Sequence, residues 1–387
     1  MSNKLIYPSR FAFTFFLLLV GSLSSTLAIA GEIYPGAVWK DDSGVAINAH
    51  GGGLLYHDGT YYWYGEHKMA GRRGNSAMVG VHCYSSENLY DWTDRGIVLP
   101  VSSDRNSEIA RGCILERPKV IYNEKTKKFV MWFHLEFRGL GYATARSGVA
   151  VSDSPTGEFT YIRSVRPNAG VWPANLSDEE KSLLQPQPGE ESSAEQRRAA
   201  RLDVLYRDFD GGQMARDMTV FVDDDGKAYH LFASEENQTL HIVLLADDYL
   251  SHTDTYVRVF PYRNMEAPAV FKHDGRYYFL ASGCTGWAPN AARSAVAENI
   301  LGPWQELGNP MVGRNPRNGL GPEKTFGGQS TYIQKVHGKQ DAFIAMFDIW
   351  NPSNPIDGRY VWLPIKLKDE RFEIHWLDTW DLSIFDQ

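Results

Sequence analysis

Apolar and aromatic residues gather in five segments of the chain, and each segment is interrupted by a polar turn that contains Asp, Asn or Gly. Runs of β-branched and aromatic residues on both sides of such a turn are typical of β-hairpins. A hairpin cannot bury its own apolar face, so five copies predict an array that closes on itself. The five segments are 51–66, 119–134, 219–234, 269–282 and 330–347.

A second repeat follows the first four hairpins. Each is followed by a further strand and by a polar turn that carries an aromatic residue or a proline. Two hairpin strands and two more strands make a four-stranded blade. We therefore predict an all-β, five-bladed β-propeller. A β-sandwich also has short strands and regular turns, but the matching order of the two repeats favours the propeller. The second set of turns lies at 85–94, 152–161, 245–256 and 297–306.

The N-terminal segment 1–30 has the pattern of a secretory signal peptide. Lys4 and Arg10 give it a basic start, Phe11–Val20 is a short apolar run, and Ala28-Ile29-Ala30 fits a small-residue cleavage site. We expect cleavage before Gly31 and a secreted or periplasmic product, with an uncleaved anchor helix as the alternative. No other segment of the sequence is apolar for long enough to span a bilayer. The catalytic propeller is expected to occupy 31–387.

One segment, 165–205, interrupts the repeat. Ser177 with Glu180 and Ser193 with Gln196 each form a capping-box pattern ahead of helical composition. We predict an inserted loop with two short helices. An insert of this length either borders a functional site or decorates the surface.

Composition excludes several classes of function. The net charge is −8 and no Lys/Arg-rich block is present, so nucleic acid is not an expected partner. Three cysteines, Cys83, Cys113 and Cys284, leave at least one free thiol, and whether Cys83 pairs with Cys113 stays open. No Cys/His spacing indicates zinc. Aromatic residues make up 13% of the chain, which suits packing between blades or the lining of a sugar site.

Candidate chemistry lies where the first strand of each hairpin begins, because these strands should start at the central axis. Carboxyl groups that converge there desolvate and repel one another, which separates their pKa values. Hydrolysis of an acetal needs one protonated carboxyl group and one group that handles water. The polar residues at these positions are Asn48-Ala49-His50, Glu116-Arg117, Arg216-Asp217, Glu266 and Gln329.

Each of these residues also has a purely structural interpretation. Glu116 and Arg117 could form a local ion pair, Asp217 could cap a turn beside Arg216, and Gln329 could be a polar strand start. Glu266 is harder to explain in this way, because Pro268 enforces an extended backbone and an apolar run follows.

The segment from Glu266 to Lys272, with Gly275, Tyr277 and Tyr278, resembles the general-acid motif of glycoside hydrolase family 43. The resemblance covers nearly all of 31–387 and implies a five-bladed propeller and an inverting glycosidase. It places the pKa-modulating Asp of the family at Asp217. The stretches INAHGGGLLYHDGTYYWYGEH, LERPKVIYN, SGCTGWAPNAARSAVAENILGPW and FGGQSTYI are similar to the exo-β-1,3-galactanase branch.

The chain departs from most of the family at its first blade. The general-base Asp of the family is missing, because this position contains Asn48-Ala49-His50. The galactanase branch also lacks it and is proposed to use a glutamine in its imidic form, which Gln329 matches. Glu116 matches a carboxylate that helps to hold sugar and water. An amide nitrogen has no accessible lone pair, so Glu116, Glu66 and His50 stay rival candidates for activating water.

The resemblance implies release of galactose from the non-reducing end of β-1,3-galactan or arabinogalactan. The alternatives are another exo-glycosidase of the family, such as an α-L-arabinofuranosidase or β-xylosidase, and a propeller that binds glycan without cleaving it. Catalysis is assigned to Glu266, Asp217, Gln329 and Glu116. No cofactor is expected, and although some members of the family carry a central cation, the sequence predicts none. The expected partner is an oligo- or polysaccharide. Substrate binding is assigned to Glu66, His50, Tyr64, Trp63 and Trp287.

Overall fold

The computed structural model describes residues 1–2, 31–186, 188–189 and 191–386. The chain divides into two units, residues 1–30 and residues 31–387, and the second contains all the secondary structure described. The predicted signal peptide lies, from residue 3 on, outside the described residues. Of the helices that the structure describes, none has the length and apolar composition to cross a membrane.

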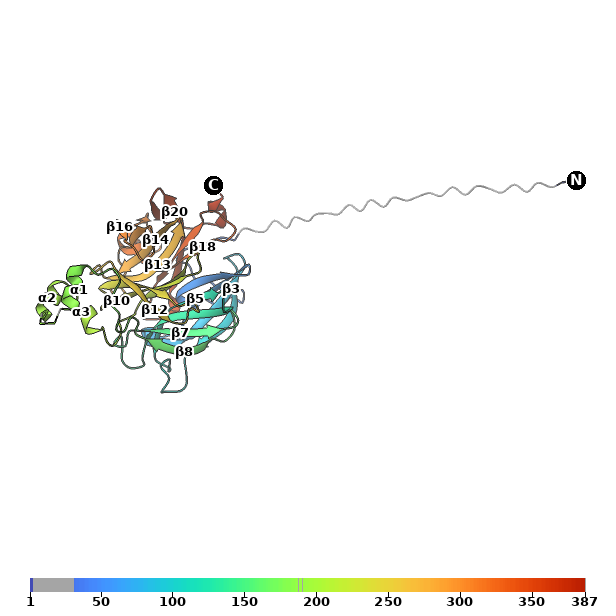
Figure 1. Ribbon diagram of the computed structural model, residues 1–387. Helices are drawn as coiled ribbons and strands as arrows, with labels where there is room; N and C mark the ends of the chain where they lie inside the picture. The colour runs from blue at the N-terminus through green and yellow to red at the C-terminus, as the bar shows by residue number, and fades with distance from the viewer. Residues whose placement is uncertain (3–30, 187, 190, 387) are drawn as a thin grey trace. The chain divides into compact units, whose positions relative to one another are not determined.

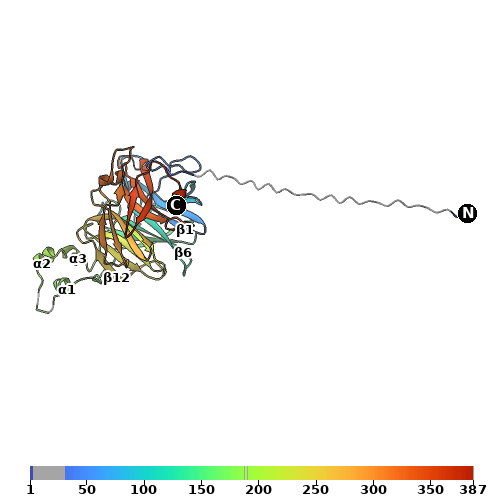
Figure 2. The same cartoon turned by 90° about the horizontal axis from the view of Figure 1, so that it is seen from above.

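Five sheets, antiparallel except for one short strand, form the propeller within residues 31–387, as predicted (Figures 1 and 2). Each sheet is entered through one of the five predicted hairpins. We call the sheets blades 1 to 5 in chain order. The strands of blades 1 and 2 are β1 (His50–His57), β2 (Thr60–Lys68), β3 (Met78–Ser86), β4 (Thr93–Pro100), β5 (Ile114–Asn123), β6 (Lys128–Glu136), β7 (Arg146–Ser152) and β8 (Thr160–Val165).

The other three blades follow the same plan, and blade 5 gains an extra short strand. That strand, β17, pairs in parallel with β21. The strands of blades 3 to 5 are β9 (Met218–Val222), β10 (Ala228–Ser234), β11 (Thr239–Leu245), β12 (His252–Val259), β13 (Met265–His273), β14 (Arg276–Gly283), β15 (Arg293–Ala297), β16 (Gln305–Gly308), β17 (Met311–Val312), β18 (Gln329–Lys335), β19 (Phe343–Ile349), β20 (Arg359–Lys368) and β21 (Arg371–His375).

The first strands of the hairpins, β1, β5, β9, β13 and β18, contact one another in ring order around the axis. The ring closes where β18 meets β1, and a bridge between Ile33 and Trp380 joins the two ends of residues 31–387. Short 3₁₀ helices lie between strands at η1 (Gly74–Ala77), η2 (Pro322–Gly327) and η3 (Pro355–Asp357), and another, η4 (Leu382–Phe385), follows β21.

The core is divided into apolar layers between neighbouring blades. Between blades 5 and 1, Trp63 packs against Trp92 and Trp362, with ring centroids 5.3 and 4.9 Å apart. Complete burial of a large apolar side chain stabilises a fold by about 1.5–3 kcal/mol. Many of the aromatic residues that the structure describes pack in these layers and hold the blades together.

Turn chemistry explains the hairpins. Asp58-Gly59 and Asp274-Gly275 connect their strands through two residues that both have positive φ, as type I′ turns require. Glycine accepts this conformation without strain, and Asp tolerates it better than most residues do.

Four inner strands, β1, β5, β13 and β18, carry a register shift close to their start, and in three of them the next residue has a left-handed backbone. Register shifts occur after His50, Glu116 and Glu266, and the residue that follows each has a left-handed backbone: φ is 62° at Gly51, 58° at Arg117 and 52° at Ala267. A bulge turns the local direction of the side chains and often lies beside an active site. For Arg117 and Ala267 such a backbone is strained, and the surrounding structure must enforce it.

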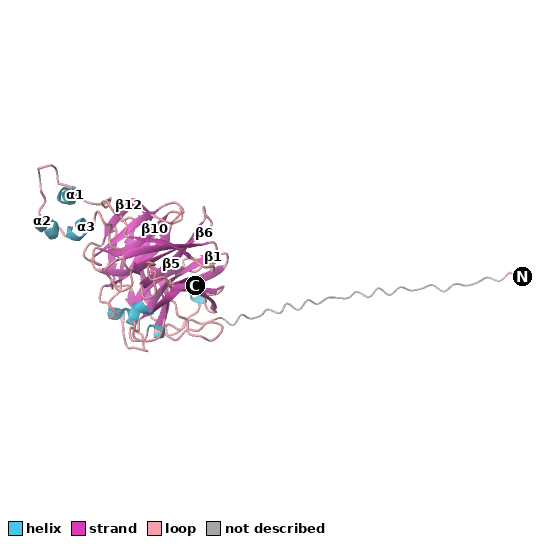
Figure 3. Cartoon of the chain, turned by 90° about the horizontal axis from the view of Figure 1, so that it is seen from below, coloured by secondary structure: helices cyan, strands magenta, loops and turns pink. Residues whose placement is uncertain are grey.

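The insert forms three helices, α1 (Asp178–Leu184), α2 (Ala194–Ala199) and α3 (Asp203–Arg207), where two were predicted. Both predicted capping boxes are present. The insert has a small core of its own formed by Leu176, Leu184, Leu202 and Leu205, and it lies beside β12 (Figures 2 and 3). Asn175 fixes it there through two hydrogen bonds to the backbone of Arg258.

Candidate active site

The inner strands begin around a pocket of about 330 Å³, to which all five blades contribute side chains. Ligand sites in proteins typically measure about 300–1,000 Å³, so this pocket suits a small group. The structure brings the four residues predicted to be catalytic into its lining: Glu116, Asp217, Glu266 and Gln329.

Glu266 projects from the bulge of β13. Its Oε1 accepts hydrogen bonds from Asn237 Nδ2 at 2.9 Å and from the Cys284 thiol at 3.0 Å. No hydrogen bond from the described residues reaches Oε2. Burial, followed by the charge of Asp217, raises the pKa of Glu266 to about 7. The group therefore keeps its proton near neutral pH and has an oxygen free to deliver it.

Arg117 connects three blades at the floor of the pocket. Its guanidinium donates to Asp217 Oδ2 at 2.9 Å, to Gln329 Oε1 at 2.6 Å and to the Ser330 carbonyl at 3.1 Å. Two structural interpretations are therefore wrong. Arg117 pairs with Asp217 and not with its neighbour Glu116, and Arg216 donates instead to the Tyr142 carbonyl.

Glu116 is held as an anion. Burial would raise its pKa, but the hydrogen bond and charge of His134, with further contributions from Lys68 and Tyr142, lower it to about 2. For His134, burial is outweighed by Glu116 and Glu136, which raise its pKa to about 9. A protonated imidazole thus lies between two carboxylates, in the middle of a buried charge network.

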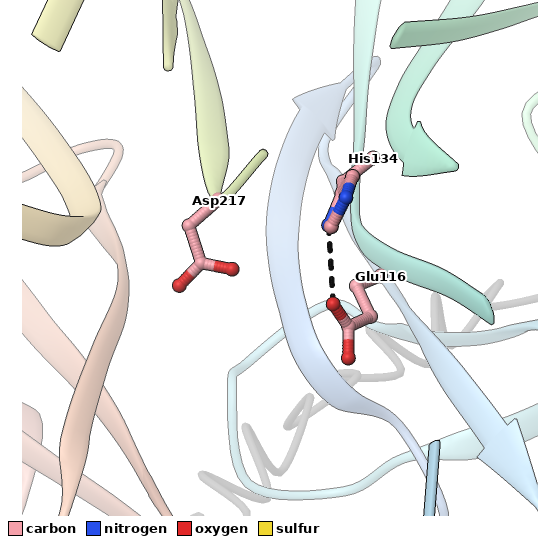
Figure 4. Close-up of side chains that lie close together, drawn as sticks. All are labelled: Glu116, His134 and Asp217. Carbon is pink, nitrogen blue, oxygen red and sulfur yellow. Dashed lines mark hydrogen bonds and ion pairs between the residues drawn. The ribbon is translucent and has the colours of Figure 1, made fainter. Parts of the chain in front are cut away.

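Glu116, His134 and Asp217 face one another from blades 2 and 3 (Figure 4), and their potential ligand atoms all lie within 4.8 Å. Each already has a partner. Both ring nitrogens of His134 contact carboxylates, and Asp217 pairs with Arg117. A cation here would have to displace a proton and meet a guanidinium, so these residues do not fit a metal site.

Gln329 is fixed in one orientation. Arg117 and the Trp350 indole N–H can only donate, so the atom that faces them must be the amide oxygen. The amide nitrogen donates to Ser282 Oγ at 2.9 Å. Its second hydrogen has no acceptor among the described residues. In this form the amide can hold a water molecule, but it cannot take a proton from one.

Only one of the three predicted sugar-stacking aromatics lines the pocket. Trp287 is 42% exposed and forms an edge contact with Trp350 at 5.9 Å, and both rings border the pocket. The predictions for Trp63 and Tyr64 are wrong. Their exposed fractions are 1% and 0%, because the two side chains point to opposite faces of β2 and fill the layers on either side of blade 1.

Two further predicted binding residues differ in position. Glu66 lines the pocket, although it is 1% exposed and forms an ion pair with Lys68 at 2.7 Å. His50 does not line it, because its ring stacks on Tyr360 and is covered by Gly358, so its assignment to substrate or water is wrong. The side chain of Glu66 packs directly against the backbone of Gly51, where an added Cβ would lie 2.1 Å from Glu66 Oε1.

The insert 165–205 contributes no residue to the pocket lining, so it does not border this site. Cys83 and Cys113 are both free and buried, and they do not pair.

Several pocket residues escaped the sequence analysis: His134, Tyr142, Asn237, Cys284 and Trp350. His134 carried a usable signal, because pairing outward from the predicted turn sets it opposite Arg117, and the bulge of β5 then places it opposite Glu116. The other four lie on loops that follow the second strand of a hairpin. Loops lack the alternation of apolar and polar residues from which the position of a strand residue can be predicted.

Comparison with known proteins agrees with this geometry. The family model for glycosyl hydrolases family 43 matches residues 202–346. A structure of a family 43 β-1,3-galactosidase, BT3683, with galactodeoxynojirimycin is 49% identical, with a TM-score of 0.82, covering 90% of this chain and 100% of that one. An exo-β-1,3-galactanase from Clostridium thermocellum is 36% identical, with a TM-score of 0.73, covering 90% and 66%.

Two further matches have lower identity. An exo-β-1,3-galactanase from Phanerochaete chrysosporium, solved with β-1,3-galactotriose, is 29% identical, with a TM-score of 0.72, covering 91% of this chain and 68% of that one. A β-D-galactofuranosidase of Aspergillus niger is 29% identical over 130 residues, which are 32% of this chain and 37% of that protein. The identity and coverage of the first match show that this chain belongs to glycoside hydrolase family 43.

Proposed function

We propose that the chain is an exo-acting β-1,3-galactosidase that releases galactose from the non-reducing end of β-1,3-galactan with inversion. The observation that carries this proposal is the pocket pairing of a carboxyl group whose pKa is raised to about 7, Glu266, with an amide, Gln329, held by Arg117. The activities of the similar β-1,3-galactosidase and exo-β-1,3-galactanases support the choice of sugar and linkage.

Glu266 is the group that protonates the departing oxygen, because it keeps its proton near neutral pH and its Oε2 is free. Asp217 forms an ion pair with Arg117, and its charge favours the protonated form of Glu266. General-acid catalysis of this kind is worth about 10²–10⁴-fold in rate.

The opposite side of the sugar faces the groups that hold water. The free N–H of Gln329 donates to the oxygen of the attacking water, and the ionised Glu116 accepts from its hydrogens. The proton that water loses passes either to Glu116 or to the imidic form of Gln329. Two donors on the amide oxygen of Gln329 oppose the imidic form. Hydrogen bonds from His134 and Tyr142 make Glu116 a weak base as well, so variants of the two residues decide between them.

Turnover of β-1,3-galactobiose tests the proposal. We expect α-galactose as the first product, because water attacks opposite the departing β-linked oxygen, and proton NMR during early turnover distinguishes the anomers. Initial β-galactose would contradict the inverting mechanism. Turnover of aryl β-xylosides or α-L-arabinofuranosides in place of galactobiose would assign the site to another sugar, and binding without turnover would make it a glycan receptor.

We also propose that the chain is exported. The basic start, apolar run and small-residue site of residues 1–30 support this assignment. N-terminal sequencing of protein recovered from the periplasm or medium is expected to begin at Gly31. Recovery only from the cytoplasm, with residues 1–30 intact, would contradict it.

A further inference from the structure

A second hollow, of about 580 Å³, lies on the same end of the propeller as the catalytic pocket. Three loops form it: β2–β3, β4–β5 and β6–β7, which belong to blades 1 and 2. We call it the arginine hollow, because its lining includes Arg73, Arg105, Arg111 and Arg138.

All four arginines are exposed, and none of their guanidinium groups has an ion-pair or hydrogen-bond partner within residues 31–186, 188–189 and 191–386. This local positive charge differs from the charge of the whole chain, which is −8. Arg138 lies over Gly112, where an added Cβ would meet its Cγ at 3.5 Å, so arginines of two loops converge. Like charges gathered in a concave surface attract anions and bind them more strongly than scattered charges do.

The arginine hollow and the catalytic pocket share a wall. Asn75 and Tyr142 face the pocket and are joined by a hydrogen bond of 2.7 Å. Arg73 lies two residues before Asn75, and Arg138 lies on the loop that carries Tyr142, and both line the hollow. Only the loops that carry Asn75 and Tyr142 separate the two sites. A polysaccharide whose end occupies the pocket can therefore place a substituent in the hollow.

We propose that the arginine hollow binds an anionic substituent, a carboxylate or a sulfate ester, on a branch of the galactan substrate. This inference rests on the proposed function and adds a substrate class to it. Guanidinium groups match both anions through paired hydrogen bonds. Met69, which is 40% exposed, adds an apolar surface to the same hollow, and a sugar ring has apolar faces as well as polar edges.

The experiment compares the wild type with the double variant Arg111→Gln/Arg138→Gln on two forms of one substrate. The first is an arabinogalactan that bears uronic acids, and the second is the same polymer after chemical reduction of its carboxyl groups to alcohols. We expect the wild type to have a lower KM for the acidic form, by about 3- to 10-fold, which is the range of one or two exposed charge-assisted contacts. The double variant should lose this preference, and added salt should weaken it in the wild type.

Arg198→Gln/Arg371→Gln is the matched control, because both arginines are exposed, lie outside both lined sites and change the net charge equally. It should keep the preference. Both double variants should turn over β-1,3-galactobiose at the wild-type rate. A sulfated galactan, compared with its desulfated form, distinguishes sulfate from carboxylate as the bound group.

The outcomes separate this inference from the proposed function. Absence of galactobiose turnover by the wild type would contradict the proposed function itself. Normal galactobiose turnover with equal KM values for acidic and neutral polymers, or equal losses in both double variants, would overturn the anion site alone.

Discussion

Replacement of Glu266 by Gln tests the central assignment, because Gln keeps the size of the side chain and cannot deliver a proton. We expect kcat on β-1,3-galactan to fall by about 10²–10⁴-fold or more, the range of general-acid catalysis. The fall should be much smaller on an aryl galactoside whose leaving group needs little protonation. KM should change little, since the variant keeps the shape of the pocket.

The same change has a consequence for stability. The pKa of Glu266 is raised from 4.5 to about 7 in the folded protein. Below pH 4.5 the group is protonated in both folded and unfolded chains and pH has no effect. As pH rises from 4.5 to about 7, the unfolded chain loses the proton first, so the wild type loses stability. The loss approaches about 3 kcal/mol above pH 7.

Glu266→Gln lacks this ionisation, so its stability relative to wild type should rise with pH through that window. Denaturant unfolding of both proteins, once below pH 4.5 and once above pH 7, measures the difference. A constant difference at the two pH values would refute the raised pKa. Equal loss of activity on galactan and on the aryl galactoside would remove Glu266 from the acid role, whatever the stability data show.

Three other variants test the surroundings of Glu266. Asp217→Asn should move the alkaline limb of the kcat/KM profile to lower pH, because the charge of Asp217 raises the pKa of Glu266; an unmoved limb in a folded variant would contradict this. Cys284→Ala should move the same limb to higher pH, because the thiol hydrogen bond lowers that pKa, and a shift in the opposite direction would show that the thiol acts otherwise. Gln329→Ala should cut kcat strongly, with partial rescue by azide, which attacks without a base. Near-normal turnover by Gln329→Ala would leave the water to Glu116, and Glu116→Gln would then be the decisive variant.

The fold could be predicted because the turn residues and the apolar alternation of each hairpin specify it locally. Asp58-Gly59 and Asp274-Gly275 fix two of the turns, and the alternation on both sides fixes which face is buried. Closure of the ring follows from the number of hairpins, since their apolar faces can be covered only by one another. The extra strand β17 of blade 5 had no such signal, because it is two residues long.

The candidate site could be predicted in part for the same reason. Inner strands that start at the axis bring their first polar residues together, and this placed Glu116, Asp217, Glu266 and Gln329 correctly in the pocket. Trp63 and Tyr64 were misassigned because aromatic rings are suited both to the apolar layers between blades and to sugar-binding sites. The sequence does not distinguish these two roles.

Loop residues could not be placed, because their backbone depends on contacts between blades. Asn237 follows Glu235 and Glu236, and all three have left-handed backbones, with φ of 65°, 50° and 59°. Such a run is held by its surroundings and not by local preference. This backbone brings Asn237 of blade 3 to Glu266 of blade 4, and the two side chains form a hydrogen bond.

Arg117 shows most clearly how the sequence misleads about partners. Its neighbour in sequence is Glu116, yet its guanidinium contacts Asp217, 100 residues away, and Gln329, 212 residues away. Closure of the propeller brings blades 2, 3 and 5 to one axis, where the bulge of β5 gives Arg117 a left-handed backbone. Glu116 is thereby left to His134, which keeps it ionised, while Asp217 and Gln329 share one buried cation. The strained backbone at Arg117 is thus held by contacts between blades, which no local pattern of residues can report.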